Sequence, residues 1–154
     1  MFGPYSVPKF YHLLNQAGLT TFHKPASHYG LSLILGGAEG TLGEITTAYA
    51  GMGRSLKGME HMSLSFLQDE NNDPLPQLYH AGAVWPTFQP IKDVNRPEEI
   101  DWTAIPSMQT VACKTGTRYC FRDARVVGVY PRYSVGGRVG HDAGDGTPGC
   151  TGAR

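Results

Sequence analysis

The chain has 154 residues, of which 40% are hydrophobic, and its 13 basic and 13 acidic residues give a formal net charge of zero. This length and composition predict one globular domain with a single buried core. The balanced charge excludes the basic surface typical of nucleic-acid binding, and the sequence contains no apolar run long enough to span a bilayer.

An amphipathic helix is predicted near the start of the chain. Apolar side chains recur at helical spacing over residues 8–17. Ser6 is placed to cap the start of this helix, and Gly18 is placed to end it.

A second helix is predicted after the glycine-bounded apolar run at residues 31–37. Thr41 and Glu44 have the spacing of a capping box, and Gly53 is predicted to end the helix. One face of the helix is apolar, formed by Ile45, Ala48, Tyr49 and Met52.

The middle of the chain gives mixed signals. Residues His61–Leu67 alternate as a strand does, and residues 69–77 have the composition of a loop. Helical periodicity returns over residues 78–91, but Pro86 and Pro90 fall inside it. An interior proline removes a hydrogen bond and costs about 3 kcal/mol, so a kinked or broken helix is expected there.

The last third of the chain changes to strand periodicity. Three strands are predicted, at residues 110–117, 124–130 and 132–140, with a tight connection at residues 130–132. Short connections favour antiparallel neighbours. Helices followed by an antiparallel meander predict an α+β fold, with helices packed on the sheet.

Cysteine and histidine spacing predicts neither a metal site nor a disulfide framework. Cys113, Cys120 and Cys150 are an odd number without a Cys-x-x-Cys pair, and the six histidines are scattered. We expect no metal and no cofactor.

The sequence KTGT, Lys114 to Thr117, is the strongest candidate for a functional site. Lys114 offers a cation, and the hydroxyls of Thr115 and Thr117 can donate to a carboxylate. Gly116 leaves the strand edge clear for a peptide. Beside a nucleophilic serine, such a strand supports acyl transfer through a serine ester, and this motif occurs in penicillin-recognising serine enzymes.

Longer stretches resemble one family, the bifunctional penicillin-binding proteins of the 1C type. The resemblance runs from about Val7 to Arg154, with glycines, Arg122, Asp123, Pro131 and the closing TGAR in register. It is carried by HYGLSLILGGAEGTLGEITTAYAGM, LYHAGAVWPTFQPIKDVNRPEEIDW and KTGTRYCFRDARVVGVYPRYSVGGRVGHDAGDGTPGCTGAR.

This resemblance implies that residues 1–154 are part of a D,D-transpeptidase domain, an incomplete penicillin-binding or β-lactamase-like fold truncated at both ends. The implied partners are peptidoglycan stem peptides ending in D-Ala-D-Ala, and β-lactams. Lys114 would set the electrostatics and help proton transfer, while Thr115 and Thr117 would hold the terminal carboxylate. The Thr117 N–H would complete the oxyanion hole. The complete protein would work at the periplasmic face of the inner membrane, held there by an N-terminal anchor outside this chain.

The catalytic serine is the missing part. SVPK, Ser6 to Lys9, has Ser-x-x-Lys spacing, but this stretch resembles the helix that follows the family's first two motifs. No serine in the chain has asparagine two residues later, as the second motif requires. We therefore interpret Ser6 as a helix cap and expect both motifs to lie before Met1.

Several residues depart from the family pattern. Arg118, which would lie beside the carboxylate-binding threonines, could attract or block an anionic substrate. Arg125 and Arg138 replace tryptophans, so each must bring a charge to water or to a partner. The other departures are Cys113 for tryptophan, Cys120 for glycine and His141 for asparagine.

Three other hypotheses remain open at this point. The chain could be a binding module without chemistry, holding a muropeptide or a protein partner on the Lys114 strand edge. It could be a small serine acyl-enzyme that uses Ser6 and Lys9, if the fold brings them within reach of Lys114. It could also fail to fold stably alone.

Overall fold

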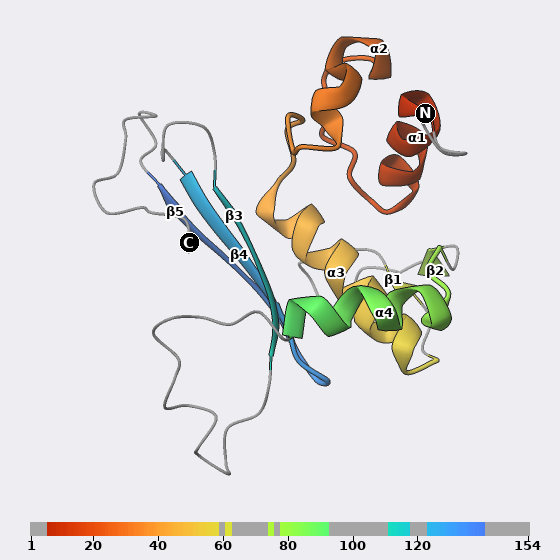
Figure 1. Ribbon diagram of the computed structural model, residues 1–154, viewed down its shortest axis with the longest axis vertical. Coiled ribbons are helices and arrows are strands. Elements are labelled where there is room, and N and C mark those ends of the chain that lie inside the picture. The colour runs from red at the N-terminus through yellow and green to blue at the C-terminus, as the bar shows by residue number, and fades with distance from the viewer. Residues whose placement is uncertain are drawn as a thin grey trace.

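The computed structural model describes residues 6–58, 61–62, 74–75, 78–92, 111–117 and 123–140. Figure 1 shows helices against one side of an antiparallel sheet, which confirms the predicted α+β class. In chain order the elements are α1 (Val7–Gln16), α2 (Ala26–Tyr29), the 3₁₀ helix η1 (Gly30–Leu33), α3 (Leu42–Leu56), β1 (His61–Met62), β2 (Pro74–Leu75), α4 (Ala81–Lys92), β3 (Ala112–Thr117), β4 (Asp123–Val129) and β5 (Ser134–Gly140).

Helix α1 forms where its periodicity predicts. Ser6 occupies the N-cap position with extended backbone, although its side chain makes no capping hydrogen bond. Pro8 lies in the first turn, where a missing N–H costs no helical hydrogen bond. Gly18, at φ +93°, ends the helix as predicted, and its N–H donates to the Asn15 carbonyl at 3.0 Å.

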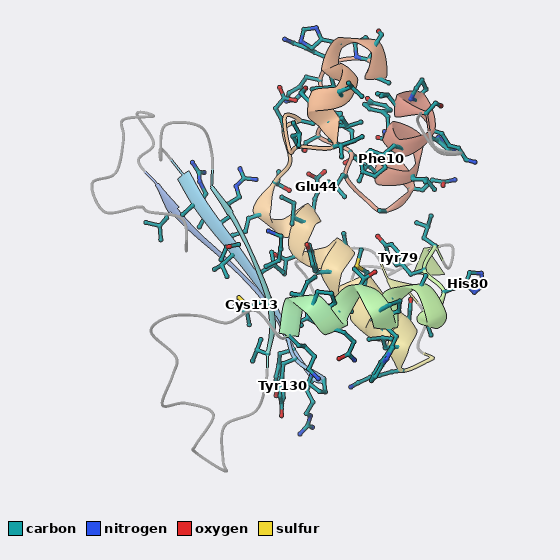
Figure 2. The ribbon with its side chains drawn as sticks, in the orientation of Figure 1. Phe10, Glu44, Tyr79, His80, Cys113 and Tyr130 are labelled. Carbon is teal, nitrogen blue, oxygen red and sulfur yellow. The ribbon has the colours of Figure 1, made fainter. Side chains whose placement is uncertain are left out.

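The predicted capping box of α3 is confirmed. The Glu44 N–H donates to Thr41 Oγ1 at 3.1 Å, and the Thr41 N–H donates to the Glu44 carboxylate at 3.0 Å. The backbone N–H and the hydroxyl of both Thr20 and Thr21 also donate to this carboxylate, at 2.6–3.1 Å. Glu44 therefore ties the segment after α1 to the N-terminal end of α3 (Figure 2).

These hydrogen bonds govern the ionisation of Glu44. Partial burial disfavours the charged form, but the hydrogen bonds from Thr21, Thr41 and Thr20 outweigh it and lower the pKa of Glu44 to about 2. Glu44 is therefore a carboxylate throughout the neutral range.

The predicted end of α3 at Gly53 is wrong, because the helix continues to Leu56. A Cβ at Gly53 would lie 3.2 Å from Val129 Cγ1, so glycine here allows α3 to approach β4 closely. The left-handed glycine that follows the helix is Gly58, at φ +67°.

Helix α4 runs through both prolines as one element, so of the predicted kink or break, the break does not occur. Val84 and Phe88 are buried, whereas Gly82, Pro86 and Pro90 are exposed. The missing N–H groups of the two prolines would have bonded the carbonyls of residues 82 and 86, which lie on this exposed side. Water can therefore donate hydrogen bonds to both carbonyls.

The three predicted strands at the end of the chain form one antiparallel sheet in the order β3-β4-β5. A two-residue turn joins β4 to β5, with the Tyr130 N–H donating to the Tyr133 carbonyl at 2.8 Å and the reverse bond at 3.2 Å. This confirms the tight connection expected there.

The hydrophobic core lies between α3, α4 and one face of the sheet. Val84 and Phe88 of α4 pack on Ala112 of β3. The residues packed around them include Tyr49, Met52, Leu56, Tyr79, Ile91 and Val129. We call this face of the sheet the helix-side face and the opposite one the outer face. The outer face exposes apolar side chains of β4 and β5, namely Val126, Val135 and Val139.

The segment between α3 and α4 contributes a second, short pairing. The strand predicted at His61–Leu67 is present as β1 over its first two residues, and residues 63–67 lie outside the described part. The loop predicted at residues 69–77 needs a correction, because Pro74–Leu75 form β2 and pair antiparallel with β1. A proline is tolerated in so short a strand because few ladder hydrogen bonds are needed.

Candidate functional site

The KTGT residues lie on β3, at an edge of the sheet. Lys114 pairs with Val127, Thr115 with Val126, Gly116 with Arg125, and Thr117 with Ala124, all on β4. Among the described residues, β3 has no strand on its other side. The backbone groups along that side can therefore receive another extended chain.

Lys114 and Thr115 point to opposite faces of the sheet, because successive side chains alternate. Lys114 shares the helix-side face with Val127, which is buried, yet Lys114 itself is exposed. Its Nζ donates to the Thr115 carbonyl at 2.5 Å. Thr115 is exposed on the outer face, so its hydroxyl is accessible to a ligand.

The remaining predicted site residues are described only in part. Gly116 is exposed, and a Cβ added to it would meet nothing within 4 Å. Thr117 is placed by its backbone pairing, while its side chain lies outside the description. Arg118, Cys120 and His141 also lie outside the described residues.

Ser6 and Lys9, the alternative nucleophile and base, lie on the first turn of α1 and are exposed. Figure 1 shows α1 beside α2 at one end of the helical layer, apart from β3. The fold therefore does not bring SVPK beside the KTGT strand.

Two arginines next to KTGT were recognised from the sequence only as departures from a pattern. Arg125 pairs with both Gly116 and Arg138, so all three lie in one row across the helix-side face. Arg125 Nη1 donates to the Gly40 carbonyl at 2.7 Å, and Arg138 is exposed. The hydrogen bond of Arg125 and the exposure of Arg138 are both expected of charges that replace apolar side chains.

A signal for this juxtaposition is present in the sequence. Arg125 and Arg138 are equally distant from the turn residues Pro131 and Arg132. In a two-residue hairpin, residues equidistant from the turn are cross-strand partners. The predicted turn could therefore have placed the two arginines side by side.

Other kinds of site find no support in the part of the chain that the structure describes. No group of three or more His, Cys, Asp or Glu residues there could hold a metal ion. No described helix is long and apolar enough to cross a membrane. Cys113 is a free thiol on the side of the sheet away from α4 (Figure 2).

Comparison with known proteins relates the chain to the penicillin-binding proteins. One relative is penicillin-binding protein 1C of Escherichia coli (strain K12), which is 34% identical over 146 residues. The match covers 94% of this chain but 18% of the relative, so the chain spans less than a fifth of that protein's length. No family model matches the chain, and no solved structure matches it. The chain is thus similar to a segment of a penicillin-binding protein.

Proposed function

We propose that this chain is part of a peptidoglycan D,D-transpeptidase domain, in which β3 binds the D-Ala-D-Ala end of a stem peptide. The proposal rests on the KTGT sequence at an exposed sheet edge, within a chain similar over 94% of its length to penicillin-binding protein 1C. An extended peptide can add to such an edge through main-chain hydrogen bonds.

The geometry of β3 suggests how the peptide is held. Because Lys114 and Thr115 lie on opposite faces, a peptide paired with the edge between them is contacted from both sides. Thr115 and Thr117 hold the terminal carboxylate through their hydroxyls, and the Thr117 N–H serves the oxyanion hole. Lys114 and Arg118 supply positive charge.

The reaction we propose for the whole protein is acyl transfer through a serine ester, with β-lactams acylating the same serine. The Ser-x-x-Lys and Ser-x-Asn motifs would be supplied from outside this chain. We further propose that the whole protein works in cell-wall synthesis at the periplasmic face of the inner membrane.

The test uses the chain after a cooperative thermal transition has shown that it folds. Incubation with a penicillin should give no adduct by intact mass, whereas a peptide ending in D-Ala-D-Ala should bind saturably. Thr115→Val should abolish this binding, because it removes one hydroxyl at constant shape. Thr87→Val, the same change at an exposed position of α4, is the control.

Two outcomes would reject the proposal. If the folded chain does not bind the peptide saturably, the proposed peptide site is wrong. A penicillin adduct mapped to Ser6 would instead favour the small serine acyl-enzyme that uses Ser6 and Lys9.

The exposed edge also favours a second candidate, a peptide-binding module without chemistry. The two candidates differ in their response to β-lactams. A transpeptidase half-site recognises a β-lactam as a peptide mimic, so a penicillin should compete with the peptide. Peptide binding that saturating penicillin leaves unchanged would support the module.

A further inference from the structure

Helix α4 has an uncharged face on the side away from its buried residues Val84 and Phe88. This face follows the helical spacing i, i+3, i+4, i+7 and i+8, and we call it the proline face: Gly82, Trp85, Pro86, Gln89 and Pro90. Trp85 is 60% exposed, Gln89 is half-buried, and the other three residues are exposed. The side of a helix that faces solvent normally carries charged residues, so an uncharged one is a candidate binding surface.

The backbone of the proline face has two carbonyl groups that lack their helical donors. In an α-helix the carbonyl of residue i accepts a hydrogen bond from the N–H of residue i+4. Pro86 and Pro90 have no N–H, so the carbonyls of Gly82 and Pro86 do not receive this bond. These carbonyls are four residues apart, which is about 6 Å along the helix axis. They therefore form a pair of hydrogen-bond acceptors on one exposed surface.

Trp85 adds an apolar ring beside these acceptors. Side chains in a helix lean toward its N-terminus, so the indole extends over the turn that contains Ala81 and Gly82. Both of these residues are small and exposed, and a Cβ added to Gly82 would meet nothing within 4 Å. The described neighbours thus leave the ring uncovered next to the Gly82 carbonyl.

The chemistry of the proline face favours a neutral ligand with hydrogen-bond donors. Residues 78–92 contain no acidic side chain, and their basic residues are His80 before the helix and Lys92 at its end. A cation would find no opposite charge on this helix, and an anion would face two carbonyl oxygens. An apolar protein surface would bury those oxygens without donors, which is unfavourable. A suitable ligand therefore combines an apolar surface with several uncharged donors.

We infer that the proline face binds a neutral glycan made of pyranose sugars. A pyranose has C–H groups on its faces and hydroxyl groups around its rim, so one ring packs on Trp85 while its hydroxyls donate to the carbonyls of Gly82 and Pro86. Gln89 lies one turn after Trp85 on the same face, where its side-chain amide both donates and accepts. The site lies on α4 and uses none of the KTGT residues, so the inference goes beyond the proposed function.

The experiment titrates the folded chain with chitotetraose, the uncharged tetramer of N-acetylglucosamine. Calorimetry gives the affinity, and the NMR signal of the Trp85 indole N–H, assigned by its absence in Trp85→Leu, reports the place of binding. We expect this signal to shift saturably. The affinity should stay constant as salt is raised, because no charged group takes part in the contact.

Three variants test the ring and the carbonyls separately. Trp85→Leu should weaken binding about tenfold, because the apolar contact with the sugar ring is lost. Tyr133→Leu, the matched control, changes an aromatic residue that is 66% exposed before β5 and should bind as the parent does. Pro86→Ala restores an N–H for the Gly82 carbonyl and should weaken binding about threefold, as the loss of one hydrogen bond does. Because Pro86→Ala also favours the helix, its weaker binding would not reflect a damaged fold.

The outcomes separate this inference from the proposed function. If the folded chain does not bind chitotetraose, if Tyr133→Leu weakens binding as much as Trp85→Leu does, or if Pro86→Ala leaves it unchanged, the inference is wrong and the peptide site on β3 stands. Trp85→Leu should bind the D-Ala-D-Ala peptide as the parent does. If Trp85→Leu loses both ligands, the glycan site is not separate from the peptide site, and the inference is wrong.

Discussion

Glu44 joins two parts of the chain through a single carboxylate. Its hydrogen bonds to Thr41 cap α3, and those to Thr20 and Thr21 hold the segment that follows α1. Hydrogen bonds to a charged group contribute about 1.5–3 kcal/mol each before competing costs are counted. The ionisation state of this one residue therefore affects how α1 and α2 are held against α3.

The pH dependence of stability tests this role. The folded-state pKa of Glu44, about 2, lies below its ordinary value of 4.5, so its contribution is complete above about pH 4.5 and is lost as the pH falls toward 2. Glu44→Gln should lower the free energy of unfolding by about 1–3 kcal/mol at pH 7 and by much less near pH 2. Denaturant titrations of both proteins across this range provide the measurement. Equal differences at pH 7 and pH 2 would contradict the role assigned to the charge.

At the scale of elements, α4 shows where prolines can be tolerated in a helix. Both of its prolines lie on the exposed side, away from Val84 and Phe88. The helix forms because burial of that apolar side outweighs the lost hydrogen bonds.

Pro86→Ala should therefore stabilise the chain. The change restores an N–H that can donate to the Gly82 carbonyl and replaces the poorest helix former with the best, for an expected gain of about 1–3 kcal/mol. Pro8→Ala, in the first turn of α1, is the control, because that position needs no helical N–H. Thermal unfolding of the two variants gives the comparison. A gain at Pro8 as large as at Pro86 would show that the lost hydrogen bond is not the cause.

The contact between α3 and β5 is set by a glycine. Gly136→Ala places a methyl group against Thr46 and Leu42 and should destabilise the chain by about 1–3 kcal/mol. Adding Thr46→Ala, which removes the overlapping hydroxyl, should recover part of the loss. Gly116→Ala, on the same sheet face without a neighbour, should change the stability little. The measurement is the free energy of unfolding of the parent and of these three variants. Equal losses for Gly136→Ala and Gly116→Ala would show that contact with α3 does not restrict position 136.

At the scale of the whole molecule, the two faces of the sheet have different environments. Val127 on the helix-side face is 4% exposed, whereas Val135 on the outer face is 66% exposed. Val127→Thr buries a hydroxyl and should cost about 2 kcal/mol of unfolding free energy, while Val135→Thr should stay within about 0.5 kcal/mol of the parent. Similar costs for both, measured by denaturant titration, would mean that the outer face is also covered.

Local patterns in the sequence were sufficient to predict much of this fold. The capping box at Thr41, the glycine after α1 and the turn between β4 and β5 depend on residues a few positions apart, so spacing alone predicted them. The role of Gly53 inside α3 could not be predicted in this way, because it depends on close contact with Val129 of a distant strand. For the same reason the bonds from Thr20 and Thr21 to Glu44 were not foreseen.

The candidate site also has features that nearby residues predict and features that depend on distant contacts. The KTGT sequence and its strand were identified from the sequence, and the structure places Lys114 and Thr115 in exposed positions on β3. Their roles toward a peptide remain predictions. The turn at Pro131 and Arg132 is enough to pair Arg125 with Arg138, but their alignment with Gly116 depends on how β3 pairs with β4, which no single stretch of sequence expresses.

The two-residue turn at Pro131 and Arg132 has a consequence for how this site can vary. Side chains alternate along a strand, so inserting one residue in the turn would carry Arg138 to the outer face and bring Val139 to the helix-side face. Arg138 would leave the row that it shares with Gly116 and Arg125 without any change in the residue itself. The length of this short connection therefore determines whether Arg138 or Val139 lies on the face of the sheet that α3 covers.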